Sequence, residues 1–391
     1  MQIYEFVLDE IDELLPFRNA VFGHLSLDHW QAMDCTAVVA RDEGELVGFI
    51  PLQFRQQRLN AQVSIPVVYE NAVGVAEGRR RQGIGSQMLE QAAQFMADRV
   101  DALFVIRGGE RSAGYRFYRK TGHGDLAYAR HYFLSPDTPL PDVGQVGIAE
   151  LDRAQWRALE PQLLALFARQ YGHLGGMQER QPGYWDRIFD GHVYRERQWQ
   201  RVVLRRQPDR LDGYMVAARG THTDTDELYV YEIAGVDEDA VRQLVAYARQ
   251  LSENGAVVIP SVTLGNPLRP LLRRLGCQER DSSPYIMARI LRPDRIFRRL
   301  AQGSDLLTDL ALMVNTPHRS CVVNEPPNPR YTVTVDTKEG VLLRLFCCRL
   351  DLEAAVEMEM VRWNVHDPGL GRELAQALAF CEWVQWFTDF V

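Results

Sequence analysis

Hydrophobic and polar positions along the chain predict one arrangement of strands that occurs twice. Residues 36–55 (TAVVARDEGELVGFIPLQFR) have the pattern of two strands joined by a turn at residues 43–45. Residues 200–219 (QRVVLRRQPDRLDGYMVAAR) have the same pattern, with the turn at residues 208–209. A β-hairpin is therefore expected at corresponding places in two halves of the chain.

The elements that follow each hairpin also correspond. Four pairs of segments match in order: the strands 67–75 (VVYENAVGV) and 228–236 (LYVYEIAGV), the helices 84–100 and 238–253, the strands 102–106 and 256–259, and the helix-and-turn segments 115–123 (YRFYRKTGH) and 268–277 (LRPLLRRLGC). Order and spacing that persist over this length favour a duplicated domain. A hairpin followed by alternating strands and helices predicts an α/β domain with a mixed sheet.

The last part of the chain has a different pattern. Residues 330–348 (RYTVTVDTKEGVLLRLFCC) predict an antiparallel hairpin turning at residues 338–340, and helices are expected at 351–362 and 371–378. The chain ends on EWVQWFTDFV, which is aromatic and apolar to its last residue. Because termini are commonly polar and frayed, this ending predicts a buried or docked C-terminus.

Two segments interrupt the periodic pattern and predict domain boundaries. Residues 134–142 (LSPDTPLPD) are rich in proline and aspartate, and residues 289–297 (RILRPDRIF) separate a strand-like run from a helix-like one. The predicted domains are residues 1–137, 138–291 and 292–391, each of ordinary domain size.

Composition narrows the classes of function. The net charge of -8 argues against general nucleic-acid binding, which needs a basic surface. The acidic N-terminus lacks the features of a signal peptide, and no apolar stretch is long enough for a membrane span. The six cysteines without CxxC spacing are typical of reduced thiols, so a cytoplasmic location is expected. The nine histidines form no HxH or HExxH pair, so no metal site is expected.

The candidate chemistry lies in residues 73–92 (VGVAEGRRRQGIGSQMLEQA). Arginines 79–81 and the Gly83-Ile84-Gly85 run stand where a predicted strand leads into a helix N-terminus, at which unpaired N–H groups favour a pyrophosphate. Glycines there let oxygens approach the backbone. The Walker pattern is absent, and Met88 replaces the third glycine of a dinucleotide motif. A basic turn that opens an ordinary helix remains the alternative.

The RRQGIG segment resembles the R/Q-x-x-G-x-G/A motif of the GNAT N-acetyltransferases, and YRFYRKTGH occupies the place of that family's tyrosine-bearing helix. Nearly the whole chain is similar to the Eis-like group of that family. The resemblance implies an α/β (α+β) fold class: tandem GNAT folds with mixed β-sheets flanked by helices, plus a C-terminal sterol-carrier-like α+β domain. It also implies acetyl-CoA as co-substrate and a homo-oligomer, a hexamer in that group.

The resemblance assigns roles to residues of the first repeat. Val73, Gly74 and Val75 would bind pantetheine, with a backbone N–H near Val75 stabilising the developing oxyanion. The pyrophosphate would be held by Arg80, Arg81, Gln82, Gly83, Ile84, Gly85 and Ser86, and the cofactor would be touched further along by Ala113 and Gly114.

Three further residues are the expected catalytic groups. Tyr118 would protonate the departing CoA thiolate, because a phenol with a reference pKa near 10 still carries its proton at neutral pH. In the Eis-like group the C-terminal carboxylate is the general base, and here it belongs to Val391. Glu70 is the alternative base. The second repeat has an equivalent Glu232 but no cofactor loop, so the alternative is that both glutamates have a structural role.

The second repeat lacks these features. Residues 236–239 (VDED) replace the arginines and glycines, and Leu272 replaces the tyrosine, so this domain is predicted to be non-catalytic. Its aromatic segment 169–189 is interpreted as core packing, with a pocket wall or an interface as the alternative. His24, Asp28 and Asp389 are interpreted as surface residues or as the lining of an acidic pocket.

Two hypotheses about function follow. The first is an acetyl-CoA-dependent N-acetyltransferase whose acceptor is a small-molecule or peptide amine, such as a polyamine, an aminoglycoside-like compound or a lysine amine. Neither a nucleic acid nor a membrane is an expected partner. The second is a non-catalytic regulatory protein that binds CoA or lipid through an inactive GNAT pair and the third domain.

Overall fold

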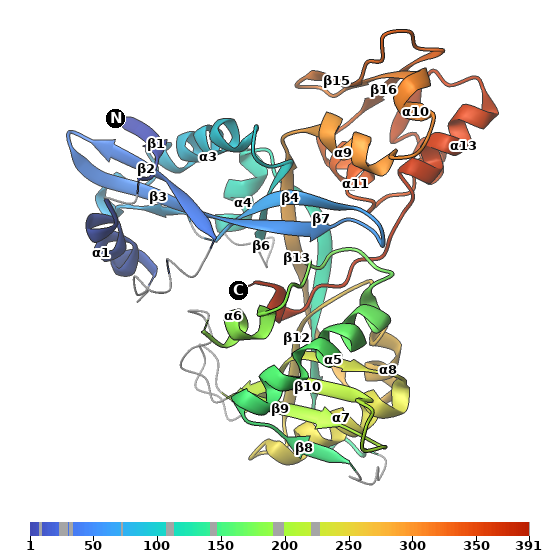
Figure 1. Cartoon of the computed structure of the whole chain (residues 1–391). Coiled ribbons are helices and arrows are strands. Elements are labelled where there is room, and N and C mark those ends of the chain that lie inside the picture. Colours follow the sequence, from blue (N-terminus) through green and yellow to red (C-terminus); the bar gives the residue numbers. More distant parts are fainter. Residues whose placement is uncertain are drawn as a thin grey trace. The chain divides into compact units, whose positions relative to one another are not determined.

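The computed structural model describes most of the chain (Figure 1). Described are residues 1–7, 10–22, 30, 34–71, 73–106, 113–140, 147–190, 199–219 and 227–390, with the backbone alone described at 281–285, 387 and 390. The chain divides into two compact units, the first made of 1–127 and 284–382 and the second of 128–283 and 383–391. Each unit has its own hydrophobic core.

The first unit contains a mixed sheet covered by helices on both faces. In order across the sheet, its strands are β1 (Gln2–Glu5), β2 (Cys35–Asp42), β3 (Glu45–Arg58), β4 (Ser64–Glu70), β6 (Ala102–Ile106) and the C-terminal part of β13 (Gln278–Ile290). Only β4 and β6 run parallel among these neighbouring pairs, whose registers cover the described residues.

Successive residues of β3 show how the helices cover the two faces. Phe49 packs in a cluster with Leu14 of α1 (Ile11–Phe22). Ile50 packs in another with Met88 of α3 (Ile84–Met96). Neighbouring side chains of a strand point to opposite faces, so α1 and α3 cover opposite sides of the sheet. Helix α4 (Ala113–Lys120) contributes Tyr118 to the α3 cluster.

The second unit repeats this architecture. Its strands are β8 (Ile148–Glu150), β9 (Trp199–Leu204), β10 (Gly213–Arg219), β11 (Leu228–Gly235), β12 (Val257–Thr263) and the end of β7 (Gly124–Leu134). Its helices are α5 (Arg153–Tyr171), α6 (Tyr184–Asp190), α7 (Glu238–Leu251) and α8 (Arg269–Arg274). Trp156, Trp185 and Tyr214 lie edge to face in the core. The interpretation of residues 169–189 as core packing is confirmed by the buried α6 side chains.

The two repeats exchange their last strands. β7, the last strand of the first repeat, pairs through Ala129–Leu134 with β12 of the second unit. β13, the last strand of the second repeat, pairs through Ile286–Ile290 with β6 of the first. Each sheet is thus completed by a strand from the other repeat, a connection that the order of elements along the sequence does not reveal.

The turn before each exchanged strand has the same geometry in both repeats. The N–H of His123 bonds to the carbonyl of Tyr118 at 3.0 Å, and the N–H of Cys277 bonds to that of Leu272 at the same distance. Gly122 and Gly276 adopt left-handed φ values of 87° and 79°. This agreement supports the alignment of YRFYRKTGH with LRPLLRRLGC on which the comparison of the repeats depends.

The chain after β13 forms a second sheet with helices. The elements are α9 (Pro293–Leu300), α10 (Leu306–Asp309), β14 (Leu310–Asn315), β15 (Ser320–Asn324), β16 (Tyr331–Thr337), α11 (Glu339–Phe346), α12 (Leu352–Glu357), β17 (Val361–Trp363) and α13 (Pro368–Ala377). The strand order is β15-β14-β16-β17, with β14 and β16 parallel. The sterol-carrier likeness and the three domain boundaries stay predictions.

Two predictions for this region are wrong. The expected hairpin at residues 330–348 is β16 followed by α11, because the apolar residues after Lys338 have helical rather than alternating spacing and are buried at Val341, Leu342 and Leu345. The helix expected at 351–362 ends at Glu357, before Glu359 takes a left-handed φ of 55°. The chain then continues as strand β17.

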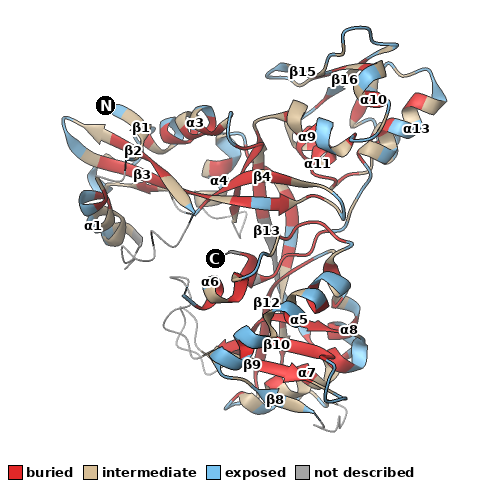
Figure 2. Cartoon of the chain, in the orientation of Figure 1, coloured by how far each residue is buried: buried red, intermediate tan, exposed pale blue. Residues whose placement is uncertain are grey.

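The C-terminal segment is buried in the second unit (Figure 2). Trp383, Val384 and Trp386 are fully buried, and a short 3-10 helix, η3 (Phe387–Phe390), follows. The prediction of a docked C-terminal segment is confirmed as far as Asp389, which is itself fully buried rather than a surface residue. No helix among the described residues is both long and apolar enough to span a membrane.

Candidate active site

The strand that pairs with β3 has one extra residue between β4 and β5. Leu52 of β3 lies opposite Glu70, whereas Phe49 lies opposite Gly74, so three steps on β3 correspond to four on its partner. The short strand β5 (Gly74–Val75) pairs only with β3 among the described strands, while β4 also pairs with β6. Such a bulge redirects a strand and is common beside active sites.

The bulge gives β5 a polar edge directed away from the sheet. The N–H of Ala76 donates to the carbonyl of Val47 at 2.9 Å, and Val75 lies opposite Gly48. Hydrogen-bonded pairs alternate along an antiparallel ladder, so the N–H and carbonyl of Val75 point away from β3. The carbonyl accepts from Arg80 Nε at 3.2 Å. The N–H faces the side on which an extended ligand could pair.

Helix α3 begins without a side-chain cap. Its N-cap is Gly83, with a left-handed φ of 84°, and among the described residues no side chain caps its first turn. Arg81 also has a positive φ, 67°. A methyl group at Gly83 would meet only Gln87 Nε2, 3.8 Å away. The first-turn N–H groups have no partner within the helix and carry positive potential, so this N-terminus fits an anion.

The side chains around this N-terminus differ in their exposure to solvent and in their ion pairs. Arg80, Arg81, Gln82 and Ser86 are exposed. Arg79, on the 3-10 helix η2 (Glu77–Arg79), pairs with Asp42 at 3.1 Å, which compensates its charge. The Ile84 side chain is buried in the core, so this residue can reach a ligand only through its backbone. Among the described residues, Arg80 and Arg81 therefore supply exposed positive charge beside the α3 N-terminus.

Gly85 has a packing role that differs from the predicted phosphate approach. A Cβ at this position would lie 3.3 Å from the Phe117 ring and 3.5 Å from Val73. The missing side chain lets α3 approach α4 and the residue before β5 closely. Gly85 therefore brings together the three elements that carry the predicted pantetheine, pyrophosphate and acid residues.

Tyr118 belongs to a buried group that includes a histidine missed at the sequence level. Tyr118 is 1% exposed, and its ring packs edge to face on His123 at 5.1 Å. His123 Nε2 lies 3.4 Å from Glu70 Oε1, and both side chains are fully buried. These atoms make no hydrogen bond within the described part of the chain. Because Cys277 stands at the corresponding place, comparison of the repeats gave no signal for His123.

The equivalent helix N-terminus in the second repeat carries its own carboxylate. Asp237 caps α7 by accepting from Ala240 N at 2.8 Å, and Arg206 donates to both Asp237 oxygens at 2.7 and 2.8 Å. β11 is one strand from Leu228 to Gly235, with a register shift against β10 next to Glu232, and Leu272 is buried where the first repeat has Tyr118. An anionic ligand at the N-terminus of α7 would be repelled by the Asp237 carboxylate, whereas the N-terminus of α3 has no such carboxylate as its N-cap.

Other predicted residues have mixed outcomes. Ala113 and Gly114 form the first turn of α4, and Ala113 is exposed. Val391, His24 and Asp28 lie outside the described residues. The structure brings together Val73, Gly85 and the α4 helix of Tyr118 in the first unit.

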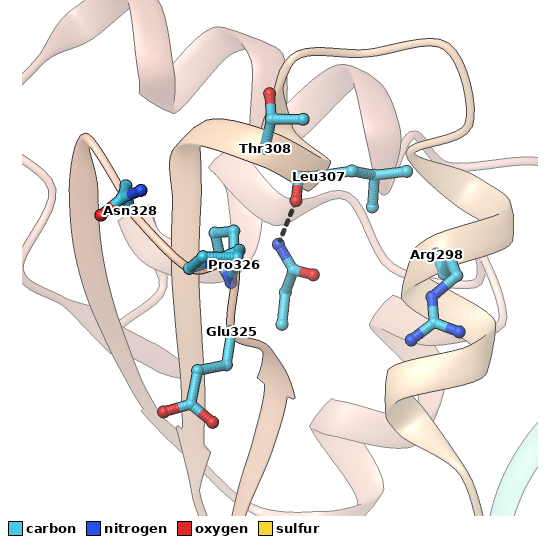
Figure 3. A pocket seen from close by; sticks show the side chains of 8 residues that line it. Arg298, Leu307, Thr308, Glu325, Pro326 and Asn328 are labelled. Atoms are coloured by element: carbon cyan, nitrogen blue, oxygen red, sulfur yellow. Dashed lines mark hydrogen bonds between the residues drawn. The ribbon is translucent and has the colours of Figure 1, made fainter.

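A separate pocket lies in the segment that follows β13. It has a volume of about 570 Å³ and is lined by residues from α9, α10 and the loop after β15, including Arg298, Leu307 and Glu325 (Figure 3). Asn324, which also lines it, donates through Nδ2 to the Leu307 carbonyl, 3.2 Å away. With a cation, a carboxylate and amide groups in its wall, the pocket does not favour a purely apolar lipid chain.

Comparison with known families identifies both repeats. The description "Acetyltransferase (GNAT) family" matches residues 5–123, and "Acetyltransferase (GNAT) domain" matches residues 176–290. These segments are two GNAT acetyltransferase domains in tandem, and GNAT acetyltransferases use acetyl-CoA. No curated protein matches the sequence.

Solved structures share the fold over the whole chain. A probable N-acyltransferase from Enterococcus faecalis V583 is 14% identical with a TM-score of 0.73, covering 98% of both chains. A GCN5-related N-acetyltransferase from Anabaena variabilis is 14% identical with a TM-score of 0.71 over 98% of both chains. Eis1 from Mycobacterium abscessus is 16% identical with a TM-score of 0.65 over 100% of both chains. The predicted fold class, tandem GNAT folds with mixed sheets flanked by helices, is confirmed.

The carboxylate at the start of α7 should stabilise the second unit in a pH-dependent way. Replacing Asp237 with alanine should lower the free energy of unfolding by about 1 kcal/mol, the usual value of an N-cap. The pKa of Asp237 is lowered to about 2, first by its hydrogen bonds from Arg206. A depressed carboxyl pKa stabilises the fold above the unfolded-state value of about 4, and this stabilisation is lost as the pH falls toward about 2.

Denaturant unfolding of wild type and Asp237→Ala, near neutral pH and near pH 3, measures this difference. Asp239→Ala is the control, because Asp239 makes only an exposed i,i+3 ion pair with Arg242 and should cost less than about 0.5 kcal/mol. A difference between wild type and Asp237→Ala that does not shrink at the lower pH would contradict the role of the ionised cap.

Proposed function

We propose that this chain is an acetyl-CoA-dependent N-acetyltransferase that acts on a primary amine. The observation that carries the proposal is the contrast between two equivalent helix N-termini. Helix α3 starts at left-handed Gly83 with no side-chain cap, whereas α7 is capped by Asp237. A pyrophosphate requires N–H donors and positive potential, which α3 and its arginines offer. The first repeat is therefore the catalytic one in this proposal.

The residues around α3 fit the parts of acetyl-CoA, which supplies the activated thioester. Residues 80–86 would hold the pyrophosphate through backbone N–H groups and the Arg80 and Arg81 side chains, and Ala113 and Gly114 would contact the cofactor further along. Val73, Gly74 and Val75 would bind pantetheine along the edge of β5. The Val75 N–H, which points away from β3, would donate to the oxygen on which negative charge develops.

Two groups complete the transfer. Tyr118 would donate its phenolic proton to the departing sulfur. The C-terminal carboxylate of Val391 would take the proton from the substrate ammonium, so that a free amine attacks. Glu70 is the alternative base. Its Oε1 lies 3.4 Å from His123 Nε2, and the His123 ring packs on that of Tyr118. The Glu70–His123 pair is therefore assigned to support the Tyr118 ring.

The acceptor is proposed to be a small-molecule or peptide amine. A polyamine, an aminoglycoside-like compound and a lysine amine are all cations, which suit a chain of net charge -8. A homo-oligomer, hexameric as in the Eis-like group, and a cytoplasmic location belong to the same proposal.

Replacement of Tyr118 with phenylalanine tests the general acid. With acetyl-CoA and a panel of such amines, release of the CoA thiol measured with a thiol reagent should fall by about 100-fold or more in kcat. The KM for acetyl-CoA should change little, because the phenol acts in the transition state. Tyr115→Phe is the matched control, since Tyr115 lies on the same helix and its hydroxyl donates to Asp125 at 2.9 Å. Unchanged turnover in Tyr118→Phe would remove the assignment.

Extension of the C-terminus distinguishes the two candidate bases. Two glycines appended after Val391 move the terminal carboxylate while leaving Glu70 in place. The extended chain should lose at least about tenfold in kcat. The loss should be greatest when the assay pH lies well below the pKa of the amine, because the substrate is then an ammonium ion that must lose a proton. A chain with full activity after extension would exclude the terminal carboxylate and favour Glu70.

A further inference from the structure

A carboxyl group and an imidazole are buried together in the first unit, beside Tyr118. Glu70 is the last residue of β4, and His123 follows the turn after α4. His123 Nε2 lies 3.4 Å from Glu70 Oε1, and both side chains are 0% exposed. Neither oxygen of Glu70 accepts a hydrogen bond from the residues that the structure describes. A buried carboxylate is costly without a positive charge next to it, so the charge of His123 decides whether Glu70 can be ionised.

The other ring nitrogen of His123 faces a hydroxyl group that already donates elsewhere. His123 Nδ1 lies 3.4 Å from Thr121 Oγ1. Thr121 Oγ1 donates to backbone carbonyls of α4, with that of Tyr118 at 3.1 Å and that of Phe117 at 3.3 Å. This is the usual bond of a helical threonine to the preceding turn. Because a hydroxyl has a single hydrogen, Thr121 Oγ1 is an acceptor toward the ring, and Nδ1 must carry a proton.

Both nitrogens of the His123 ring therefore face acceptors. A neutral imidazole has one N–H, and the Thr121 oxygen requires it at Nδ1. Two bare acceptors repel, so a second proton lies between Nε2 and Glu70, and imidazole is the stronger base of these two groups. The ring also packs edge to face on Tyr118, with the ring centres 5.1 Å apart. The groups placed against the imidazole from β4, α4 and the following turn are thus Glu70, Tyr118 and Thr121.

The second repeat gives its corresponding glutamate a permanent cation. Glu232 on β11 occupies the place of Glu70, and its side chain is also 0% exposed. Arg180 donates to its two oxygens at 2.6 and 2.8 Å, and a guanidinium is always charged. Cys277 stands at the place of His123 there. With His123 as an imidazolium, the buried glutamate of each repeat has a positive charge beside it.

We infer that His123 is a buried imidazolium held by Glu70, and that it is a positioning residue that stabilises negative charge on Tyr118. This inference rests on the proposed function, in which Tyr118 is the general acid. In that step the O–H bond of Tyr118 breaks, the S–H bond of CoA forms, and the electron pair stays on the phenolic oxygen. A positive charge fixed beside the ring in advance stabilises this phenolate without reorganisation. The phenolate regains its proton from solvent after the transfer.

Replacement of His123 with glutamine keeps a polar side chain and removes the charge. It should lower kcat by at least about tenfold with the KM for acetyl-CoA unchanged, because negative charge develops on Tyr118 only in the transition state. The control is Tyr69→Phe, which removes a buried hydrogen bond to Gln57 at 2.8 Å on the same strand as Glu70. The control should keep kcat within about twofold. Assays run below the unfolding transition of every variant.

Nitrogen-15 NMR of the intact chain, labelled at histidine, measures the charge of the ring without catalysis. The His123 signals are those that disappear in His123→Gln. At neutral pH, both ring nitrogens should be protonated in wild type, and only one should be protonated in Glu70→Gln, which lacks the carboxylate. A wild-type ring with one protonated nitrogen would overturn the inference. A doubly protonated ring in Glu70→Gln would overturn the part assigned to Glu70.

The two readouts keep the inference separate from the proposed function. A doubly protonated His123 together with an unchanged kcat in His123→Gln would overturn its role toward Tyr118. A loss of kcat in Tyr69→Phe as large as that in His123→Gln would also overturn that role, since packing would then explain both losses. A wild-type chain that transfers acetyl to no amine refutes the proposed function, and the NMR result then still decides whether the imidazolium exists.

Discussion

The candidate active site depends on the open N-terminus of α3. A helix begins with N–H groups that its own turns cannot satisfy, and most helices fill them with a side chain. Here the chain enters α3 through two left-handed residues, Arg81 and Gly83, and the part of the chain that the structure describes supplies no side-chain cap. The donors are therefore left for a ligand. Arg80 and Arg81 add charge of the sign that a pyrophosphate needs.

The strand edge at Val75 and the helix that carries Tyr118 lie next to this N-terminus. The extra residue between Glu70 and Gly74 redirects the strand, so that the Val75 N–H points away from β3. Gly85 removes the side chain that would separate α3 from α4, and α4 carries Tyr118. Donors for a phosphate, a strand edge for an extended arm and a phenol thus belong to one packed unit.

The second repeat uses the same framework for a different purpose. Asp237 caps the N-terminus of α7, whereas Gly83 stands at that of α3, and β11 continues as one strand to Gly235. Glu232, at the place of Glu70, is fully engaged by Arg180 and the C-terminal segment. The buried Glu232 carboxylate is bonded by Arg180 and Tyr214 of the same repeat and by Thr388 of the C-terminal segment.

Local patterns in the sequence predicted the elements whose residues interact with near neighbours. The strand at 102–106 and the start of α3 agree with the prediction, because periodicity and glycine placement are local properties. The hairpin at 330–348 was wrong, since an alternating run passes into a helical one at Lys338. The exchanged strands, the packing role of Gly85 and the Arg180–Asp389 ion pair depend on residues far apart in the chain, which no local pattern reveals.

The central claim, that the first repeat alone holds acetyl-CoA and does so at the α3 N-terminus, is tested by calorimetric titration of the intact chain. Wild type should bind one acetyl-CoA per chain, and Gly83→Ala should weaken that binding by about tenfold, ~1.4 kcal/mol. Gly44→Ala is the matched control, because Gly44 has a left-handed φ of 89° in an open turn, and its variant should bind as wild type does. Two sites per chain, or equal affinities in the two glycine variants, would contradict the account.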